Sequence, residues 1–260
     1  MKRTLICLDK DGYPEKFREL LDGAPIYDSS CSKAAKVIFI DRDDGYYLKC
    51  SDKGSLQKEA LMTEYFNKKG LGAAVLEYLS DDKDWLLTER VKGEDCTYAD
   101  FIASPKRLCD TIATLLRELH ETDHSGCPVD HTKEYLFTVE ENYKNGNYDP
   151  SLFFENRRYP SAEEAFKVIS DNKHLFKNDT LLHGDYCLPN IMLNDWSFSG
   201  FIDLGNGGVG DRHVDLFWGA WTLNFNLKTD KYRNRFLDAY GRDKVEEDML
   251  HIIAAAEVFG

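Results

Sequence analysis

Three polar residues in the C-terminal half of the chain have types and spacing that suit metal-assisted chemistry. Asn190 comes five residues after Asp185, and Asp203 comes 18 residues after Asp185. Each lies in a predicted turn beside an apolar stretch. Oxygen ligands of this kind suit Mg²⁺, which takes one or two carboxylates together with waters and phosphate oxygens. A carboxylate that is not a metal ligand, here Asp185, can orient a hydroxyl group or accept its proton.

Taken singly, each of these residues is better explained by turn structure, because Asp and Asn side chains cap local backbone groups. The longer pattern is more specific. Residues 183–190 read H-G-D-Y-C-L-P-N, and residues 201–205 read F-I-D-L-G. The order, the spacing and the flanking apolar stretches agree over both segments.

This block resembles the aminoglycoside phosphotransferase family, and within it the aminoglycoside 3′-phosphotransferase group. The family's H-G-D-x-x-x-x-N and I-D-x-G correspond to the kinase catalytic loop and its following D-F-G. Residues 210–216 are also similar to the family's G-D-x-x-x-D-L. The resemblance implies an α+β, protein-kinase-like two-lobe fold, with a small antiparallel β lobe and a larger, mainly helical lobe. It assigns catalysis to Asp185 and Mg²⁺ to Asn190 and Asp203.

Upstream residues complete the nucleotide site that the resemblance implies. Lys49 ends a predicted strand and is similar to the lysine that contacts the α and β phosphates of ATP or GTP. Glu59, ten residues later, is expected to pair with Lys49, and Glu64 is the alternative partner. Without the downstream block, Lys49 is better explained as a solvated lysine at the end of a strand.

Two further segments belong to this predicted nucleotide site. Ser30 and Ser32 lie in a short Ser-rich loop that lacks G-x-G-x-x-G, and its hydroxyl and N–H groups can donate to phosphate oxygens. The backbone at Glu89 and Val91 is expected to bind the purine edge. The choice between ATP and GTP stays open.

The implied acceptor is a polycation that binds beside an acidic large lobe. The residues that resemble acceptor ligands of the 3′ group are Glu155, Asn156 and Glu257. Three positions depart from the group's pattern: Arg158 and Ala256 replace expected acids, and Asn206 replaces an expected arginine.

Hydrophobic periodicity separates a β-rich first part from a helical second part. Before residue 91 the pattern predicts strands at 25–28, 36–40, 46–50, 74–79 and 85–90, and helices at 14–21 and 55–69. After residue 93 it predicts helices at 106–120, 161–174, 213–226, 231–240 and 244–259, with short strands and turns over 180–205. We therefore expect a nucleotide-binding lobe at 1–90, a hinge at 91–93, and a lobe with the catalytic loop and acceptor site at 94–260.

The composition excludes several classes of protein. The chain has 33 basic and 46 acidic residues, a net charge of −13, divided as 15 − 17 = −2 over residues 1–90 and 18 − 29 = −11 over residues 91–260. The negative net charge argues against a nucleic-acid partner and favours a cationic acceptor, although it is also explained by solubility alone.

No apolar run approaches the ~20 residues of a membrane span, and no signal peptide is recognisable, so we expect a cytoplasmic protein without a membrane partner. The seven cysteines form no C-x-x-C pair and are expected to be reduced thiols.

The sequence thus predicts an enzyme that moves the γ-phosphoryl group of ATP or GTP to a hydroxyl of an aminoglycoside antibiotic, conferring resistance. Two alternatives stay open. One is a kinase of the same fold for another small acceptor, such as a choline-like compound, a sugar or a peptide antibiotic. The other is a non-catalytic, nucleotide-binding pseudokinase.

Overall fold

The structure, a computed structural model, describes residues 3–31, 34–148 and 159–260, which form two compact units. Unit 1 contains residues 1–98 and 189–205, and unit 2 contains residues 99–188 and 206–260. The sequence places all of 189–205 in the second lobe, whereas its backbone pairs with unit 1. The N–H of Phe201 donates to Leu71, and that of Cys96 donates to Ile191. A hinge at 91–93 stays a prediction.

Unit 1 is built on one antiparallel sheet of six strands in the order β1-β2-β3-β4-β6-β5. Its strands are β1 (Thr4–Ile6), β2 (Ile26–Asp28), β3 (Lys36–Ile40), β4 (Tyr46–Asp52), β5 (Val75–Ser80) and β6 (Lys83–Glu89). A turn at 41–45 joins β3 to β4, the strands predicted at 36–40 and 46–50, and Gly45 closes the turn at φ +95°.

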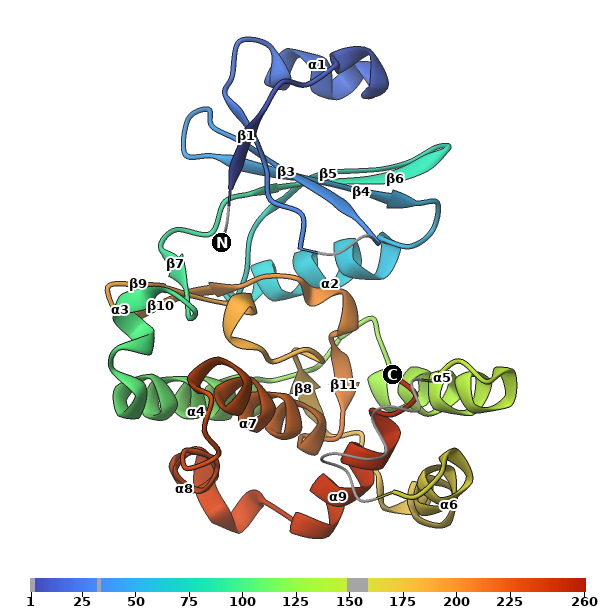
Figure 1. The fold of residues 1–260 in the computed structure, drawn as a ribbon. Helices are drawn as coiled ribbons and strands as arrows, with labels where there is room; N and C mark the ends of the chain where they lie inside the picture. The colour runs from blue at the N-terminus through green and yellow to red at the C-terminus, as the bar shows by residue number, and fades with distance from the viewer. Residues whose placement is uncertain (1–2, 32–33, 149–158) are drawn as a thin grey trace. The chain divides into compact units, whose positions relative to one another are not determined.

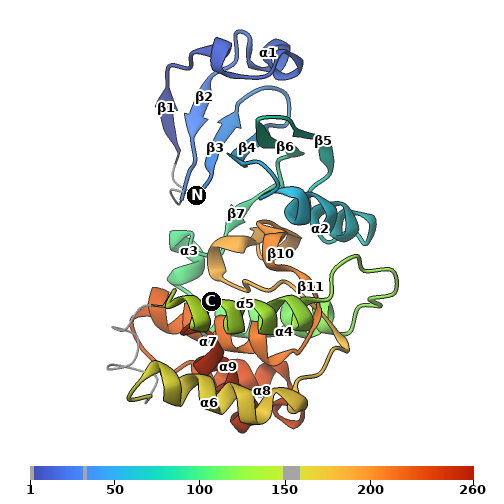
Figure 2. The same ribbon diagram turned by 90° about the vertical axis from the view of Figure 1, so that its right-hand side faces the viewer.

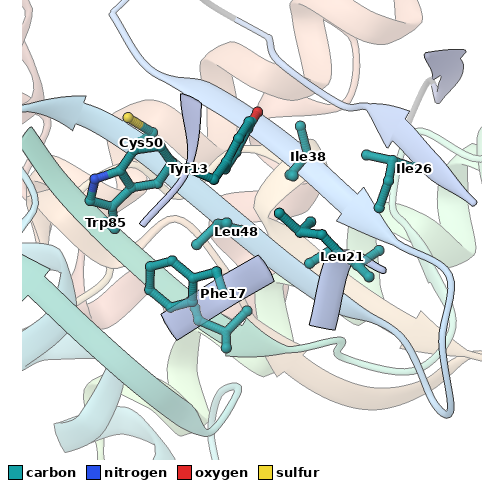
Figure 3. Close-up of a cluster of buried hydrophobic side chains, with 10 residues drawn as sticks. Tyr13, Phe17, Leu21, Ile26, Ile38, Leu48, Cys50 and Trp85 are labelled. Atoms are coloured by element: carbon teal, nitrogen blue, oxygen red, sulfur yellow. The ribbon is translucent and has the colours of Figure 1, made fainter. Parts of the chain in front are cut away.

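The two helices of unit 1, α1 (Glu15–Leu21) and α2 (Gln57–Lys68), pack on opposite faces of this sheet. Figure 3 shows Phe17 and Leu21 of α1 in contact with the face that carries Leu48 and Trp85. Side chains alternate between the two faces of a strand, so Lys49 is on the other face, where α2 packs. Gly70, at φ +72°, follows the end of α2, which the sequence placed at 69.

Unit 1 also contains a second, three-stranded sheet, which lies between Asn190 and Asp203 in its larger part. It contains β7 (Glu94–Asp95), β9 (Ile191–Asn194) and β10 (Ser197–Phe201), in the order β10-β9-β7. The β9–β10 hairpin lies between Asn190 and Asp203 in the sequence, so it brings the two ends of that segment back together. The N–H of Ile202 donates to the carbonyl of Asn190 at 3.1 Å.

Unit 2 is mainly helical. Its helices are α3 (Ala99–Ile102), α4 (Pro105–His120), α5 (His131–Asn145), α6 (Ala162–Asn172), α7 (His213–Leu227), α8 (Arg233–Gly241) and α9 (Glu247–Ala256). A short antiparallel pair, β8 (Thr180–Leu182) and β11 (Gly208–Gly210), lies among them, with α4 against β8 and α5 against β11 (Figures 1 and 2). Because β8 leads directly into residues 183–188, this core fixes the start of the segment that contains Asp185.

Most predicted helices and strands are present, but the prediction missed the short elements β1, β7 and α3 and the longer helix α5. Helix α5 carries few buried side chains, His131 and Val139 among them, so its hydrophobic pattern is weak. Its ends are defined instead by an Asp130 side chain that accepts from the Lys133 N–H and by left-handed Gly146. In the part of the chain that the structure describes, no helix has the length and apolar character needed to cross a bilayer.

Candidate nucleotide site and catalytic loop

Lys49 lies at the centre of a charged group in unit 1. Its Nζ is 2.7 Å from a carboxylate oxygen of Glu59 and 2.8 Å from one of Asp203. Glu64, the alternative partner, instead faces Lys68 across one turn of α2. A strand, the helix that follows it and the distant turn after β10 therefore meet at one ammonium group.

The local fold explains why Lys49 and Glu59 meet. Lys49 is paired across the sheet with Leu86, and Leu86 packs against Leu56 and Ala60 of α2. Glu59 lies in the first turn of that helix and reaches the same face of the sheet. Burial opposes the charge on Lys49, but the carboxylates of Asp203 and Glu59 outweigh burial and raise its pKa. Lys49 is therefore held as a fixed cation.

Asp203 and Asn190 fit the oxygen donors that Mg²⁺ uses together with phosphate oxygens. The Ile202–Asn190 hydrogen bond places the residues side by side in unit 1. The Asp203 side chain is 53% exposed, and its backbone is held in the left-handed region at φ +58°. Such strained conformations are found at functional sites. No group of three or more His, Cys, Asp and Glu side chains within the described ranges could hold a metal alone, so a metal here would need further oxygen ligands.

The Ser-rich loop between β2 and β3 is already partly hydrogen-bonded. The N–H of Ser30 donates to Asp28 at 2.9 Å, and its hydroxyl accepts from the Val37 N–H at 2.9 Å. A phosphate group would have to displace Asp28 from Ser30. Ser32 lies outside the described residues.

The predicted purine-binding segment follows β6. The N–H of Glu89 donates to the carbonyl of Ala74 at 3.0 Å, and the N–H of Arg90 donates to Gly45 at 3.0 Å. What Glu89 can still offer a purine is its carbonyl oxygen. Val91 is buried.

Asp185 belongs to unit 2 and follows β8 in a tight loop. Its side chain is half-buried, and its N–H lies 3.3 Å from the imidazole Nδ1 of His183. The loop needs glycine at position 184, where φ is +82° and a Cβ would lie 1.9 Å from the carbonyl oxygen of Asn206. This requirement explains the Gly of H-G-D in physical terms.

A buried carboxylate holds this loop from beneath. Asp215 of α7 accepts from the N–H groups of His183 and Gly184, both at 2.8 Å, and lies 3.1 Å from Nε2 of His120. The Tyr240 hydroxyl lies 2.8 Å from Nδ1 of the same imidazole. Burial lowers the pKa of His120, so the ring is neutral and donates from Nε2 while Nδ1 accepts from Tyr240.

Hydrogen bonds keep Asp215 ionised despite its burial. Burial alone would raise the pKa of this carboxyl, but His120 and the His183 N–H bring it below its ordinary value. Two more contacts fix the rest of the loop. The Tyr186 hydroxyl donates to Ile112 of α4 at 2.7 Å, and the Leu188 N–H donates to the Thr222 hydroxyl of α7 at 3.1 Å.

The predicted acceptor residues are only partly described. Glu155, Asn156 and neighbouring Arg158 lie outside the described residues. Glu257 follows α9 and is buried, and one of its oxygens accepts from the Tyr135 hydroxyl at 2.7 Å. Ala256 is fully buried, so this position offers neither charge nor exposed surface.

Comparison with known proteins gives the family. Residues 34–250 match the family model described as the phosphotransferase enzyme family. A probable aminoglycoside 3′-phosphotransferase of Lactococcus lactis is 51% identical over 100% of this chain and 99% of its own length. The chain belongs to the phosphotransferase enzyme family. The predicted membership among aminoglycoside phosphotransferases is confirmed.

Solved structures of aminoglycoside phosphotransferases share this fold. A type VIII aminoglycoside 3′-phosphotransferase superposes with a TM-score of 0.76 at 22% identity and covers 96% of each chain. An aminoglycoside phosphotransferase from Streptomyces rimosus, in complex with ADP and streptomycin, superposes with a TM-score of 0.68 at 23% identity over 85% of this chain and 90% of its own. The predicted α+β, kinase-like fold class is confirmed.

Sequence reasoning missed the support beneath the loop. The G-D-x-x-x-D-L pattern did include Asp215, but with no role assigned, and nothing marked His120 or Tyr240. The signal for Asp215 was present in the motif. His120 is only the last residue of an amphipathic helix, and Tyr240 is 120 residues further on, so no local pattern connects them.

Proposed function

We propose that this phosphotransferase moves the γ-phosphoryl group of ATP, with Mg²⁺, to a hydroxyl group of an aminoglycoside. The observation that carries the proposal is the contact of the Lys49 ammonium with both Glu59 and Asp203. A structural ion pair needs one carboxylate. A cation held between two carboxylates, one of them half-exposed, is suited to bind an anion and its metal together.

Lys49 would contact the α and β phosphates, and Glu59 would hold the ammonium in place. The purine would lie against the backbone that follows β6, where the carbonyl of Glu89 and the backbone of Val91 would read its edge. The same contacts also accommodate GTP. The name of the Streptomyces rimosus neighbour, a complex with ADP, supports an adenine nucleotide.

Asn190 and Asp203 would hold Mg²⁺ through an amide and a carboxylate oxygen. When bound, the ion neutralises the charge that develops on the β and γ phosphate oxygens. The remaining oxygens of the shell would come from the nucleotide and water.

Asp185 would accept the proton of the acceptor hydroxyl. The hydroxyl oxygen forms a bond to the γ phosphorus, the bond between that phosphorus and the β–γ bridging oxygen breaks, and ADP leaves with the electron pair. The proton passes to the Asp185 carboxylate and then to solvent. In loose phosphoryl-transfer transition states, positioning and electrostatics supply most of the rate enhancement, which explains why the loop backbone is so firmly held.

The acceptor class rests on the identity to the Lactococcus lactis relative and on the charge of −11 over residues 91–260. Glu257 would bind an ammonium group, with Glu155 and Asn156 as further ligands. A resistance function would follow from modification of the drug. Ala256 places a buried methyl group where the 3′ group is expected to have an acid, so this position would not bind an ammonium group. A less highly charged small alcohol, of the choline or sugar type, is therefore a second candidate acceptor.

The test is a panel of acceptors with ADP release as the readout, together with growth of a susceptible host on each drug. We expect Mg²⁺-dependent turnover with kanamycin-type compounds and protection against the same drugs. Turnover only with choline-like or sugar alcohols would contradict the aminoglycoside acceptor and favour one of these compounds. Nucleotide binding without turnover on any acceptor would contradict the enzymatic function and favour a nucleotide-binding module.

A further inference from the structure

Helix α7 of unit 2 carries an exposed row of aromatic rings that the proposed reaction does not use. Trp221 and Phe225 are 39% and 55% exposed and stack with ring centroids 4.9 Å apart at an interplanar angle of 11°. Trp218 contacts Trp221 edge-on at 5.3 Å. Large exposed aromatic groups of this kind mark binding surfaces.

The row flanks the buried side of α7 that holds the loop of residues 183–188. Residues 218, 221, 222 and 225 follow the i, i+3, i+4, i+7 spacing of one helix face. Thr222 is a member of this stripe, and its hydroxyl accepts from the Leu188 N–H of the loop. Asp215, three residues before Trp218, holds the N–H groups of the same loop.

The other end of the row leads towards the predicted acceptor residue. Trp218 packs against a buried cluster that contains Leu182 of β8 and Ile253 of α9. Leu182 directly precedes the H-G-D segment, and Ile253 lies one helical turn before Glu257. Within unit 2 the aromatic row is therefore linked by direct packing both to the strand that leads to Asp185 and to the helix that leads to Glu257.

One contact shows which kind of group this surface attracts. The ammonium of Lys228 lies 4.3 Å from the centroid of the Phe225 ring. Aromatic faces attract ammonium groups through the ring quadrupole, and the attraction needs no carboxylate. The cationic acceptor of the proposed function carries several such groups, while Ala256 supplies no carboxylate.

We propose that Phe225, with Trp221 stacked behind it, is an acceptor subsite that holds one ammonium group of the substrate by cation–π contact. Lys228 occupies this ring until the acceptor replaces it. The inference rests on the proposed function for the identity of the acceptor. It adds a specificity-determining aromatic site to the carboxylates that the family resemblance implies.

Steady-state kinetics of Phe225→Leu tests the subsite, because leucine keeps the apolar bulk and removes the quadrupole. We expect the KM for an aminoglycoside to rise about three- to tenfold while the KM for ATP is unchanged. Lys228→Asn removes the competing ammonium, with a residue that tolerates the left-handed backbone at φ +54°, and should lower the acceptor KM. Phe137→Leu, on a 65% exposed ring of α5, is the matched control and should change neither KM.

An analogue in which one amine is replaced by a hydroxyl identifies the ammonium group that binds. For the analogue that lacks this amine, wild type and Phe225→Leu should have the same acceptor KM. An unchanged acceptor KM in Phe225→Leu, or an equal loss for every analogue, would overturn the subsite while leaving the proposed function intact.

A binding measurement decides the case even if no aminoglycoside is turned over. Tetramethylammonium titrated into the wild-type chain should shift the indole N–H resonance of Trp221, and the shift should be lost in Phe225→Leu. Absence of turnover with a clear shift would reject the proposed acceptor and keep the ammonium site. Absence of the shift would reject the site.

Discussion

Two carboxylate centres, one in each unit, differ in what their oxygens do. The Asp203 side chain is 53% exposed, with one oxygen on Lys49. The Asp215 side chain is 0% exposed, and both its oxygens are taken by the N–H groups of the loop and by His120. An exposed carboxylate can still bind a ligand, whereas a saturated, buried one can only position the protein. The comparison therefore separates the residues that should govern ligand binding from those that should govern stability and loop geometry.

The largest expected effect comes from Asp203→Asn. Turnover should fall at least about 1000-fold, which is about 4 kcal/mol of transition-state stabilisation, because both the metal ligand and a partner of Lys49 change. The free energy of unfolding should change by less than about 1 kcal/mol, since the side chain is half-exposed. ADP release and urea unfolding measure the two quantities. Asp81→Asn, in an exposed turn of the same unit, is the control, and a variant that keeps its turnover would remove Asp203 from the site.

Asp215→Asn should have the opposite profile. An amide placed against two backbone N–H groups leaves buried donors unpaired, so the free energy of unfolding should fall by about 3 kcal/mol. The kcat of the enzyme that remains folded should fall, because the backbone of residues 183–184 is no longer held by the Asp215 carboxylate. Chemical unfolding, together with kcat and KM on folded protein, measures both effects.

Asp211→Asn is the matched control for this loss. Asp211 is also buried beside a histidine, His213, but its oxygens hold the N–H groups of Lys177 and His213 instead of the catalytic loop. We expect a similar loss of stability with an unchanged kcat. If both variants lose kcat equally, Asp215 is simply a stability residue.

A smaller effect is expected from Glu59→Gln. The amide keeps the shape of the side chain but removes one of the two charges that hold Lys49, so the KM for ATP should rise about tenfold, or about 1.4 kcal/mol. Glu64→Gln, whose partner is Lys68 at the surface, should leave the KM unchanged. Equal effects of the two substitutions would contradict the assignment of Glu59 as the partner.

The last expected effect, similar in size to that of Glu59→Gln, is a pH dependence of stability within unit 1. Burial opposes ionisation of Asp84, but hydrogen bonds from Ser80, the Gly54 and Leu56 N–H groups and Tyr78 lower its pKa from 3.8 to about 2. Because the folded-state pKa is depressed, the contribution is complete above about pH 4 and is lost as the pH falls towards about 2. The stability gap between wild type and Asp84→Asn should therefore close by about 1–2 kcal/mol over this window. A gap that stays constant with pH in urea titrations would show that Asp84 does not titrate in this way.

How much the sequence could predict depended on how local each signal was. Lys49 and Glu59 could be matched because a strand and the first turn of the next helix contain them, ten residues apart. The segment from Asp185 to Asp203 was recognisable because a hairpin fixes its spacing. His120, Asp215 and Tyr240 come from three helices, and the distances in sequence are 95 and 120 residues, so only the fold brings them together.

The membership of residues 189–205 in unit 1 could not be predicted for a related reason. The hydrophobic pattern identified short strands there but not the strands with which they pair. Pairing is decided by backbone hydrogen bonds such as that from the Phe201 N–H to Leu71, which no periodicity records. In contrast, Gly184 belonged to the recognised H-G-D block, and the structure shows that its conformation admits no other residue without strain.

The most direct test compares Asp185→Asn with wild type in two assays, ADP release with a kanamycin-type acceptor and binding of Mg²⁺–nucleotide. The account predicts that turnover falls at least about 1000-fold while the nucleotide Kd stays within about threefold, because Asp185 accepts the hydroxyl proton and is not assigned to the metal or the phosphates. An Asp185→Asn enzyme that keeps its turnover would contradict the central claim.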